Sequence, residues 1–267
     1  MIDELDGYDE SFVPEDENVP WYIGIGGLIT FSTIIPLNIY AKLDEIAKWS
    51  WFWPFIGALI GVFGCLVGFL LNNILLLDSL ITATIIYTIY ILLNGGHHID
   101  GLLDLGDVLM AHGTPERKRK ILKETDIGVG AITILICVSL LTIAALNSVI
   151  NKNLFLAIII AEIGAKIGLI TCLATSQPFP EGTGVAFIKK MTPTIFLIIF
   201  IICIILSFFI LQGLGAIGIL GGVFGGAIIS YYAKKNLNGT NGDVIGASNE
   251  FARMTSLIFI LISITWF

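Results

Sequence analysis

Long apolar runs without a charged residue constrain this chain more than any other feature. The clearest run, Ile195 to Leu211, contains one polar residue, Ser207. About twenty apolar residues in a helix cross the roughly 30 Å hydrocarbon core of a bilayer. The 267-residue chain is 56% hydrophobic and 13% charged, whereas soluble domains carry about 25% charge. The sequence therefore predicts an all-α, polytopic integral membrane protein rather than a β-barrel, whose strands would alternate apolar and polar residues.

Hydropathy and helix-breaking residues predict about eight transmembrane helices. We expect them near residues 21–40, 51–72, 77–96, 129–150, 154–173, 193–212, 214–233 and 250–266. Residues 1–20 contain eight acidic residues and no Lys or Arg, so we expect a partly disordered acidic tail and not a signal peptide. Residues 21–267 then form a single transmembrane domain.

Basic residues fall almost entirely on one side of this predicted membrane. That side receives Lys42, Lys48, Arg117, Lys118, Arg119, Lys120, Lys123, Lys189, Lys190, Lys234 and Lys235. The other side receives only Lys152. Loops rich in Lys and Arg stay in the cytoplasm. We therefore expect a multi-pass protein of the cell membrane whose polar loops face the cytoplasm. The run Arg117–Lys120 is equally consistent with attraction to anionic lipid.

An acidic cluster follows the third predicted span, where the chain reads Gly-Gly-His-His-Ile-Asp-Gly-Leu-Leu-Asp-Leu-Gly-Asp from Gly95 to Asp107. In a helix, the spacing places Asp100, Asp104 and Asp107 on one face about 60° wide. Carboxylates that close repel one another unless a cation holds them, and hard oxygen ligands suit Mg²⁺ together with substrate phosphates. We predict a Mg²⁺ site, with solvation of a loop start as the alternative.

Other residues of the same side complete the predicted site. His98 is a candidate general base, or else a structural hydrogen-bonding residue. Gly101 and Gly106 leave room for a phosphate ester near the backbone. Two further loops, Gln177–Gly184 with Glu181 and Asn238–Asp243 with Gly242 and Asp243, carry glycines beside a carboxylate, and the second is a possible anion nest. Lys123 is a candidate ligand for a diphosphate.

Three more features have structural interpretations. Gly218, Gly222 and Gly226 form a small-residue ribbon for close helix packing. The single cysteines Cys65, Cys137, Cys172 and Cys203 have no metal-binding spacing, so we interpret them as small apolar residues. Glu162 and Lys166, four residues apart within a span, can pair with one another, structurally or functionally.

In combination the motifs resemble the cobalamin synthase family of membrane-bound adenosylcobinamide-GDP ribazoletransferases. The family's hallmark, roughly Gly-Gly-x-His-Leu-Asp-Gly-Leu-x-Asp-x-x-Asp, aligns with Gly95–Asp107 and places His98 in the histidine position. Weaker matches follow in order at Phe31–Pro36, Lys123–Gly128, Pro180–Gly184 and Gly239–Ala247. The chain departs from the family where Ile34 and Phe179 replace arginines, Glu124 replaces an aspartate and Asn241 replaces a threonine.

The resemblance implies a Mg²⁺-dependent phosphotransferase of cobalamin biosynthesis. It would join adenosylcobinamide-GDP to α-ribazole, or to its 5′-phosphate, and release GMP. The implied metal ligands are Asp100, Asp104, Asp107 and Asp243, with His98 as the base and Lys123, Glu181, Gly101 and Gly242 as substrate contacts. We expect no nucleic-acid partner, and the sequence leaves open whether the protein forms a homo-oligomer. The alternatives are a phosphotransferase of the CDP-alcohol type, whose Asp-x-x-Asp-Gly-x-x-Ala-Arg order is absent, and a proton-coupled transporter.

Overall fold

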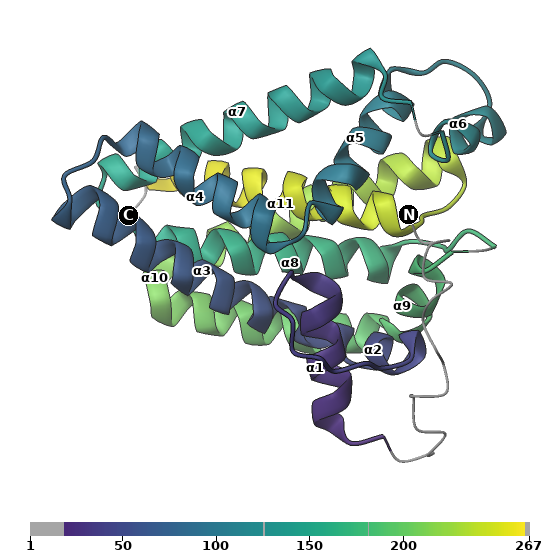
Figure 1. The fold of residues 1–267 in the computed structure, drawn as a ribbon, viewed down its shortest axis with the longest axis horizontal. Coiled ribbons are helices and arrows are strands. Elements are labelled where there is room, and N and C mark those ends of the chain that lie inside the picture. Colours follow the sequence, from purple (N-terminus) through teal and green to yellow (C-terminus); the bar gives the residue numbers. More distant parts are fainter. Residues whose placement is uncertain (1–18, 125, 181, 265–267) are drawn as a thin grey trace.

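The computed structural model describes residues 19–124, 126–180 and 182–264, and most of them lie in helices (Figure 1). Within these ranges the chain has no named strand and a single isolated β-bridge, Pro178 to Thr240. The elements in chain order are α1 (Trp21–Ser32), α2 (Leu43–Lys48), η3 (Ser50–Phe52), α3 (Trp53–Phe69), η4 (Leu70–Ile74), α4 (Ser79–Leu93), α5 (His97–Met110), α6 (Pro115–Ile121), α7 (Val129–Asn151), α8 (Leu156–Thr175), α9 (Gly184–Lys190), α10 (Pro193–Leu237) and α11 (Gly242–Ser263).

Five helical segments of the described chain are long and apolar enough to cross a membrane. They are Ser50–Ile74, α7, α8, α10 and α11, and a sixth arises if the bent pair α4 and α5 is counted as one span. The predicted all-α, polytopic class is therefore confirmed, whereas the predicted number of eight spans is not. The number differs mainly because α1 is shorter than a span and because two predicted spans fall within the single helical element α10.

The prediction of a span over residues 21–40 is wrong in length. The α1 helix has 12 residues and ends at Ser32, after which Thr33 is extended. Ile35 precedes Pro36, and a residue before proline is disfavoured in the helical conformation. Asn38 then adopts a positive φ of 52°. These two backbone constraints keep the apolar residues after Ser32 out of a helix.

The chain reverses direction inside α10. Leu211 and Gln212 leave the helical conformation, with φ/ψ of −140°/28° and 49°/−139°. A Cβ atom built on Gly215 would overlap the carbonyl oxygen of Ser207, although eight residues of continuous helix would separate the two by about 12 Å. The two limbs of α10 thus correspond to the predicted spans 193–212 and 214–233.

The α8 helix is the centre of the bundle, and α3, α10 and α11 pack around it (Figure 1). Every residue from Ala157 to Leu173 is buried. The glycine ribbon of α10 allows this approach, because a Cβ on Gly222 would overlap the backbone of Gly164, and one on Gly226 that of Gly168. The predicted packing role of the ribbon is confirmed.

The two ends of the bundle differ in charge. In Figure 1 one end carries α2, α6 and α9, and the opposite end carries the start of α4 and the end of α7. The first end holds the basic residues of α6, Lys189 and Lys190 of α9, and Lys234 and Lys235 at the end of α10. Lys152 follows α7 at the other end. The fold therefore gathers these basic residues at one end of the bundle, as predicted, and leaves Lys152 at the other.

Substitution of Gly226 by Leu should destabilise the protein, because the backbones of α8 and α10 leave no room for a side chain. Overpacking of this kind costs about 1–3 kcal/mol or more, so we expect the thermal midpoint in detergent to fall by several degrees. Ile228→Phe adds volume at a side chain that is 37% exposed and serves as the control. An equal loss of midpoint in both variants would contradict this packing argument.

Candidate active site

The acidic helix α5 begins at a sharp bend. The axes of α4 and α5 differ by 95°, and the two residues at the bend, Gly95 and Gly96, have positive φ values of 63° and 75°. Only glycine adopts such angles readily, which explains the Gly-Gly pair in front of the histidines. Because α5 is helical as predicted, Asp100, Asp104 and Asp107 share one face.

The last loop of the chain brings a fourth carboxylate to this helix. A Cβ on Gly101 would overlap the carbonyl oxygen of Asp243, so α5 and the first turn of α11 touch through their backbones. The carboxylates of Asp100, Asp107 and Asp243 all act electrostatically on Asp104. We call Asp100, Asp104, Asp107 and Asp243 the acidic cluster. The expected meeting of the acidic helix with the loop after α10 is confirmed.

Asp107 also holds the start of α7. Its Oδ2 accepts a hydrogen bond from the backbone N–H of Gly128 at 2.8 Å, and its Oδ1 accepts one from Ala131 at 2.8 Å. A negative charge at a helix N-terminus satisfies free N–H groups and interacts favourably with the helix dipole. Asp107 thus fixes α7 against α5, and both of its oxygens already have protein partners.

The structure corrects the interpretation of two glycines. The space beside Gly101 is filled by the Asp243 backbone, and the space beside Gly106 by Ala131 and Gly130 at 2.9 Å. Both residues permit close packing between helices, so neither opens the backbone to a phosphate ester. Gly242 is less crowded, because among the described residues a Cβ there would meet only the Thr183 hydroxyl oxygen, at 3.2 Å.

Two loops meet beside the acidic cluster. The N–H of Phe179 donates to the carbonyl of Thr240 at 3.0 Å, and the N–H of Thr240 donates to the carbonyl of Gln177 at 2.9 Å. The expected convergence of the Gln177–Gly184 and Asn238–Asp243 loops is therefore confirmed. Glu181 itself lies outside the described residues. Lys123 is exposed just after α6, and within the described part of the chain its side chain has no hydrogen bond or ion pair with the acidic cluster.

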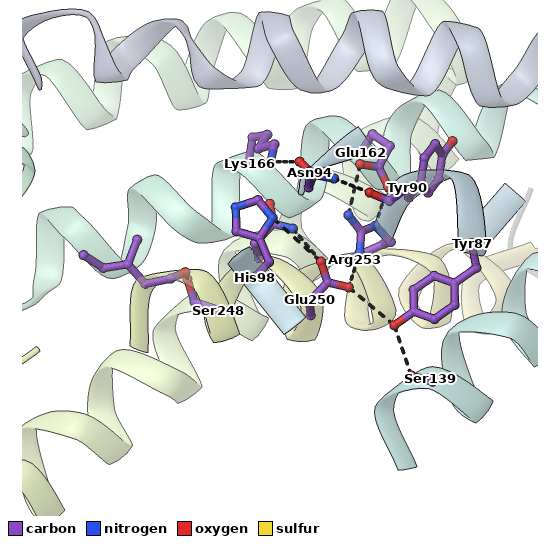
Figure 2. Close-up of polar contacts among 12 residues, drawn as sticks. Tyr87, Tyr90, Asn94, His98, Ser139, Glu162, Lys166, Ser248, Glu250 and Arg253 are labelled. Atoms are coloured by element: carbon purple, nitrogen blue, oxygen red, sulfur yellow. Dashed lines mark hydrogen bonds and ion pairs between the residues drawn. The ribbon is translucent and has the colours of Figure 1, made fainter. Parts of the chain in front are cut away.

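A buried network of charged side chains lies deeper in the bundle (Figure 2). Arg253 of α11 donates from Nε and Nη2 to the two carboxylate oxygens of Glu162 on α8, the second at 3.2 Å. Its Nη1 donates to Glu250, one turn earlier on α11. All three side chains are at most 3% exposed. Charges inside a membrane are costly and are held in place by partners.

The predicted pairing of Glu162 with Lys166 is corrected by this network. Glu162 binds Arg253, whose planar guanidinium matches both carboxylate oxygens. Lys166 instead donates to the side-chain oxygen of Asn94 at 3.2 Å. Asn94 ends α4 and donates to the carbonyl of Tyr90 at 2.7 Å. The formal charges of two carboxylates, Glu162 and Glu250, and of two basic side chains, Arg253 and Lys166, therefore cancel within the bundle.

The sequence analysis did not identify Glu250 and Arg253 as functional or structural candidates. They lie at the start of the predicted last span, 250–266, where Glu250 and Arg253 interrupt an otherwise mainly apolar stretch. A carboxylate and a guanidinium three residues apart in such a stretch are the sequence signal by which this pair could have been found. Their partner Glu162 is 91 positions away from Arg253, so only the packing of α8 against α11 identifies the complete set.

His98 connects the network to the acidic helix. Its side chain is 13% exposed, and its Nδ1 lies 3.9 Å from Oε1 of Glu250. This Nδ1 is buried and has no hydrogen-bond partner within the described residues. Figure 2 shows the ring beside Glu250. Nδ1 therefore faces the carboxylate of the network.

The acidic cluster suits a divalent cation shared with a phosphate ligand. In the described residues no three His, Cys, Asp or Glu side chains are arranged to enclose a metal ion by themselves. Mg²⁺ commonly binds through one or two carboxylates, with substrate phosphates and water completing its coordination. Asp100, Asp104 and Asp243 have the hard oxygen atoms for this, and their mutual repulsion favours a cation between them.

Replacement of Arg253 by Met should destabilise the fold strongly, since it leaves Glu162 and Glu250 buried without a counter-charge. Loss of one partner in a buried ion pair costs about 3–5 kcal/mol. The control is Arg119→Met, which removes a guanidinium that pairs with Glu116 near the surface and should cost below about 1 kcal/mol. Thermal unfolding in detergent measures both; a midpoint for Arg253→Met no lower than that of the control would refute the assigned role.

Comparison with known proteins places the whole bundle in one family. The profile of the family described as cobalamin-5-phosphate synthase matches residues 24–261. Similar proteins include the adenosylcobinamide-GDP ribazoletransferases of Methanosarcina barkeri (31% identity, 87% of this chain and 89% of the relative) and Methanococcoides burtonii (30%, 88% and 90%). That of Clostridioides difficile is 27% identical over 90% of this chain and 97% of its own length.

No solved structure shows significant similarity to the chain. The family match covers every residue of the acidic cluster and of the buried network. The chain therefore belongs to the cobalamin-5-phosphate synthase family and is a membrane-embedded transferase of cobalamin biosynthesis.

Proposed function

We propose that the protein transfers the adenosylcobinamide phosphate group from adenosylcobinamide-GDP to α-ribazole, or to its 5′-phosphate, with Mg²⁺ at the acidic cluster. The observation that carries this proposal is the backbone contact of Gly101 on α5 with Asp243 on α11, which brings Asp243 to the helix of Asp100 and Asp104 at the basic end of the bundle. The relatives named above supply the substrate class. A diphosphate donor needs a cation at such a carboxylate site.

In the proposed reaction a ribose hydroxyl of the acceptor attacks the phosphorus attached to cobinamide. A new O–P bond forms, the bond between that phosphorus and the bridging oxygen of GMP breaks, and GMP leaves with the bridging oxygen. The bound Mg²⁺ would neutralise the diphosphate and stabilise the charge on the leaving GMP. Asp100, Asp104 and Asp243 would hold it, while Asp107 keeps α7 docked on α5.

The protein itself must also accept the proton of the attacking hydroxyl. We assign this step to Nε2 of His98, because Nδ1 of the same ring faces Glu250 inside the bundle. A neutral imidazole accepts a proton near neutral pH. The apolar environment of α5, where Leu102 and Leu105 are buried, excludes water from the inner face of the helix and so limits competing hydrolysis.

The decisive experiment is GMP release by purified protein. We expect GMP from adenosylcobinamide-GDP only when Mg²⁺ and an acceptor, α-ribazole or its 5′-phosphate, are both present. Asp104→Asn should lower the turnover number by about a thousandfold, since loss of a ligand to a charge-neutralising metal costs several kcal/mol of barrier. Asp126→Asn changes an exposed carboxylate and is the control. Normal turnover of Asp104→Asn at modest Mg²⁺ would exclude the metal assignment.

We further propose that the acidic cluster faces the cytoplasm from the cell membrane. The support is the concentration of Lys and Arg at the same end of the bundle. A cysteine introduced at Thr114 should react with a membrane-impermeant thiol reagent only from the cytoplasmic side, and one at Asn153 only from outside. Both positions are exposed. Labelling of the two positions from the same side, or in the reverse order, would be incompatible with this orientation.

A further inference from the structure

One face of α11 contacts the start of α5 at three successive points. Asp243, Gly246 and Glu250, spaced three and four residues apart, lie on the same side of the helix. The Asp243 backbone fills the space beside Gly101, and a Cβ on Gly246 would lie 3.3 Å from the Cα of His98. Oε1 of Glu250 lies 3.9 Å from Nδ1 of the same histidine. The α11 helix therefore contacts both the backbone and the ring of His98.

Neighbouring side chains hold the carboxylate of Glu250 in one orientation (Figure 2). Its Oε2 accepts hydrogen bonds from Nη1 of Arg253 and, at 3.5 Å, from the hydroxyl of Tyr87. Arg253 is fixed in turn by its ion pair with α8. The other oxygen, Oε1, accepts from Nδ2 of Asn249 at 3.0 Å and faces His98. Because an ionised carboxylate oxygen has two lone pairs, Oε1 can accept a second hydrogen bond from the histidine.

Nδ1 of His98 is a buried polar atom that lacks a hydrogen bond among the described residues. A buried donor or acceptor without a partner costs free energy. The distance of 3.9 Å to Oε1 of Glu250 exceeds that of a hydrogen bond by about 1 Å. Hydrogen bonds between catalytic groups are often long before substrate binds and shorten in the complex. Since an ionised carboxylate only accepts, a bond between these two atoms requires the proton to be on Nδ1.

We infer that Glu250 is a positioning residue for His98. Its Oε1 accepts a hydrogen bond from Nδ1–H, which orients the ring, keeps the proton on Nδ1 and leaves the lone pair of Nε2 free. A carboxylate bonded to one ring nitrogen sets the tautomer and orientation of a histidine in this way. The inference rests on the proposed function, in which Nε2 accepts the proton of the attacking hydroxyl, and it names the residue that makes this nitrogen available.

The kinetic test compares two variants that each neutralise one carboxylate beside Arg253. Glu250→Gln removes the charge that faces His98. Its matched control, Glu162→Gln, removes a carboxylate of α8 that has no ion pair with the histidine among the described residues. Glu250→Gln should lower the turnover number about a hundredfold, the contribution of a well-placed general base, with KM for both substrates within about twofold of the wild type. Glu162→Gln should lower the thermal midpoint similarly, because it weakens the same buried ion pairs, but should keep the turnover number within about threefold.

The tautomer of His98 is measured without turnover by ¹⁵N NMR of histidine-labelled protein at neutral pH. The chain has three histidines, so the loss of signals in His98→Gln assigns those of His98. In the wild type we expect a protonated Nδ1 and an unprotonated Nε2. Glu162→Gln should retain this state, and Glu250→Gln should lose it, because the carboxylate that accepts from Nδ1 is gone.

An unprotonated Nδ1 in the wild type, a ring protonated on both nitrogens, or equal losses of turnover in Glu250→Gln and Glu162→Gln would overturn the inference. If Glu250→Gln does not fold, the wild-type spectrum still decides between the two tautomers. Absence of GMP release from a wild type whose His98 tautomer depends on Glu250 refutes the proposed function and leaves the pairing in place. GMP release by a wild type with the proton on Nε2 overturns the pairing and leaves the transfer reaction in place.

Discussion

The clamp of Arg253 between Glu162 and Glu250 is the interaction on which the arrangement of this bundle depends. It joins α8, the central helix, to α11 at a depth where no water is available to solvate an unpaired charge. Sliding α11 along α8 by one turn would separate the guanidinium from the Glu162 carboxylate. The network therefore specifies the register of the two helices, and with it the position of Asp243 at the start of α11.

Close backbone packing adds a second constraint. Gly222 and Gly226 bring α10 against Gly164 and Gly168 of α8, and Gly101 brings α5 against Asp243. Between transmembrane helices the hydrophobic effect contributes little, because lipid is as apolar as the side chains, so van der Waals contact and polar bonds determine which helices associate. Small residues at these positions allow both. The same contacts place the acidic cluster where α5, α7 and α11 meet.

The polar end of the bundle separates opposite charges over a short stretch of chain. Asp243 belongs to the acidic cluster, whereas Lys234 and Lys235 end α10 a few residues before it in the chain. His98 links this surface to the buried network through Glu250.

Hydropathy, Lys and Arg counts and helical spacing are local properties of the chain, so they were sufficient to predict the helical membrane class, the basic end of the bundle and the shared face of Asp100, Asp104 and Asp107. The sequence did not identify Glu250 and Arg253, and it paired Glu162 with Lys166. Those assignments depend on contacts between helices far apart in the chain. The length of α1 depends on backbone angles that hydropathy does not record, whereas the reversal at Gln212 falls at the boundary predicted between two spans. The contacts of Gly101 and Asp107 follow from helix packing, since a glycine or a carboxylate is equally suited to a ligand or to a neighbouring helix until the packing fills the space beside it.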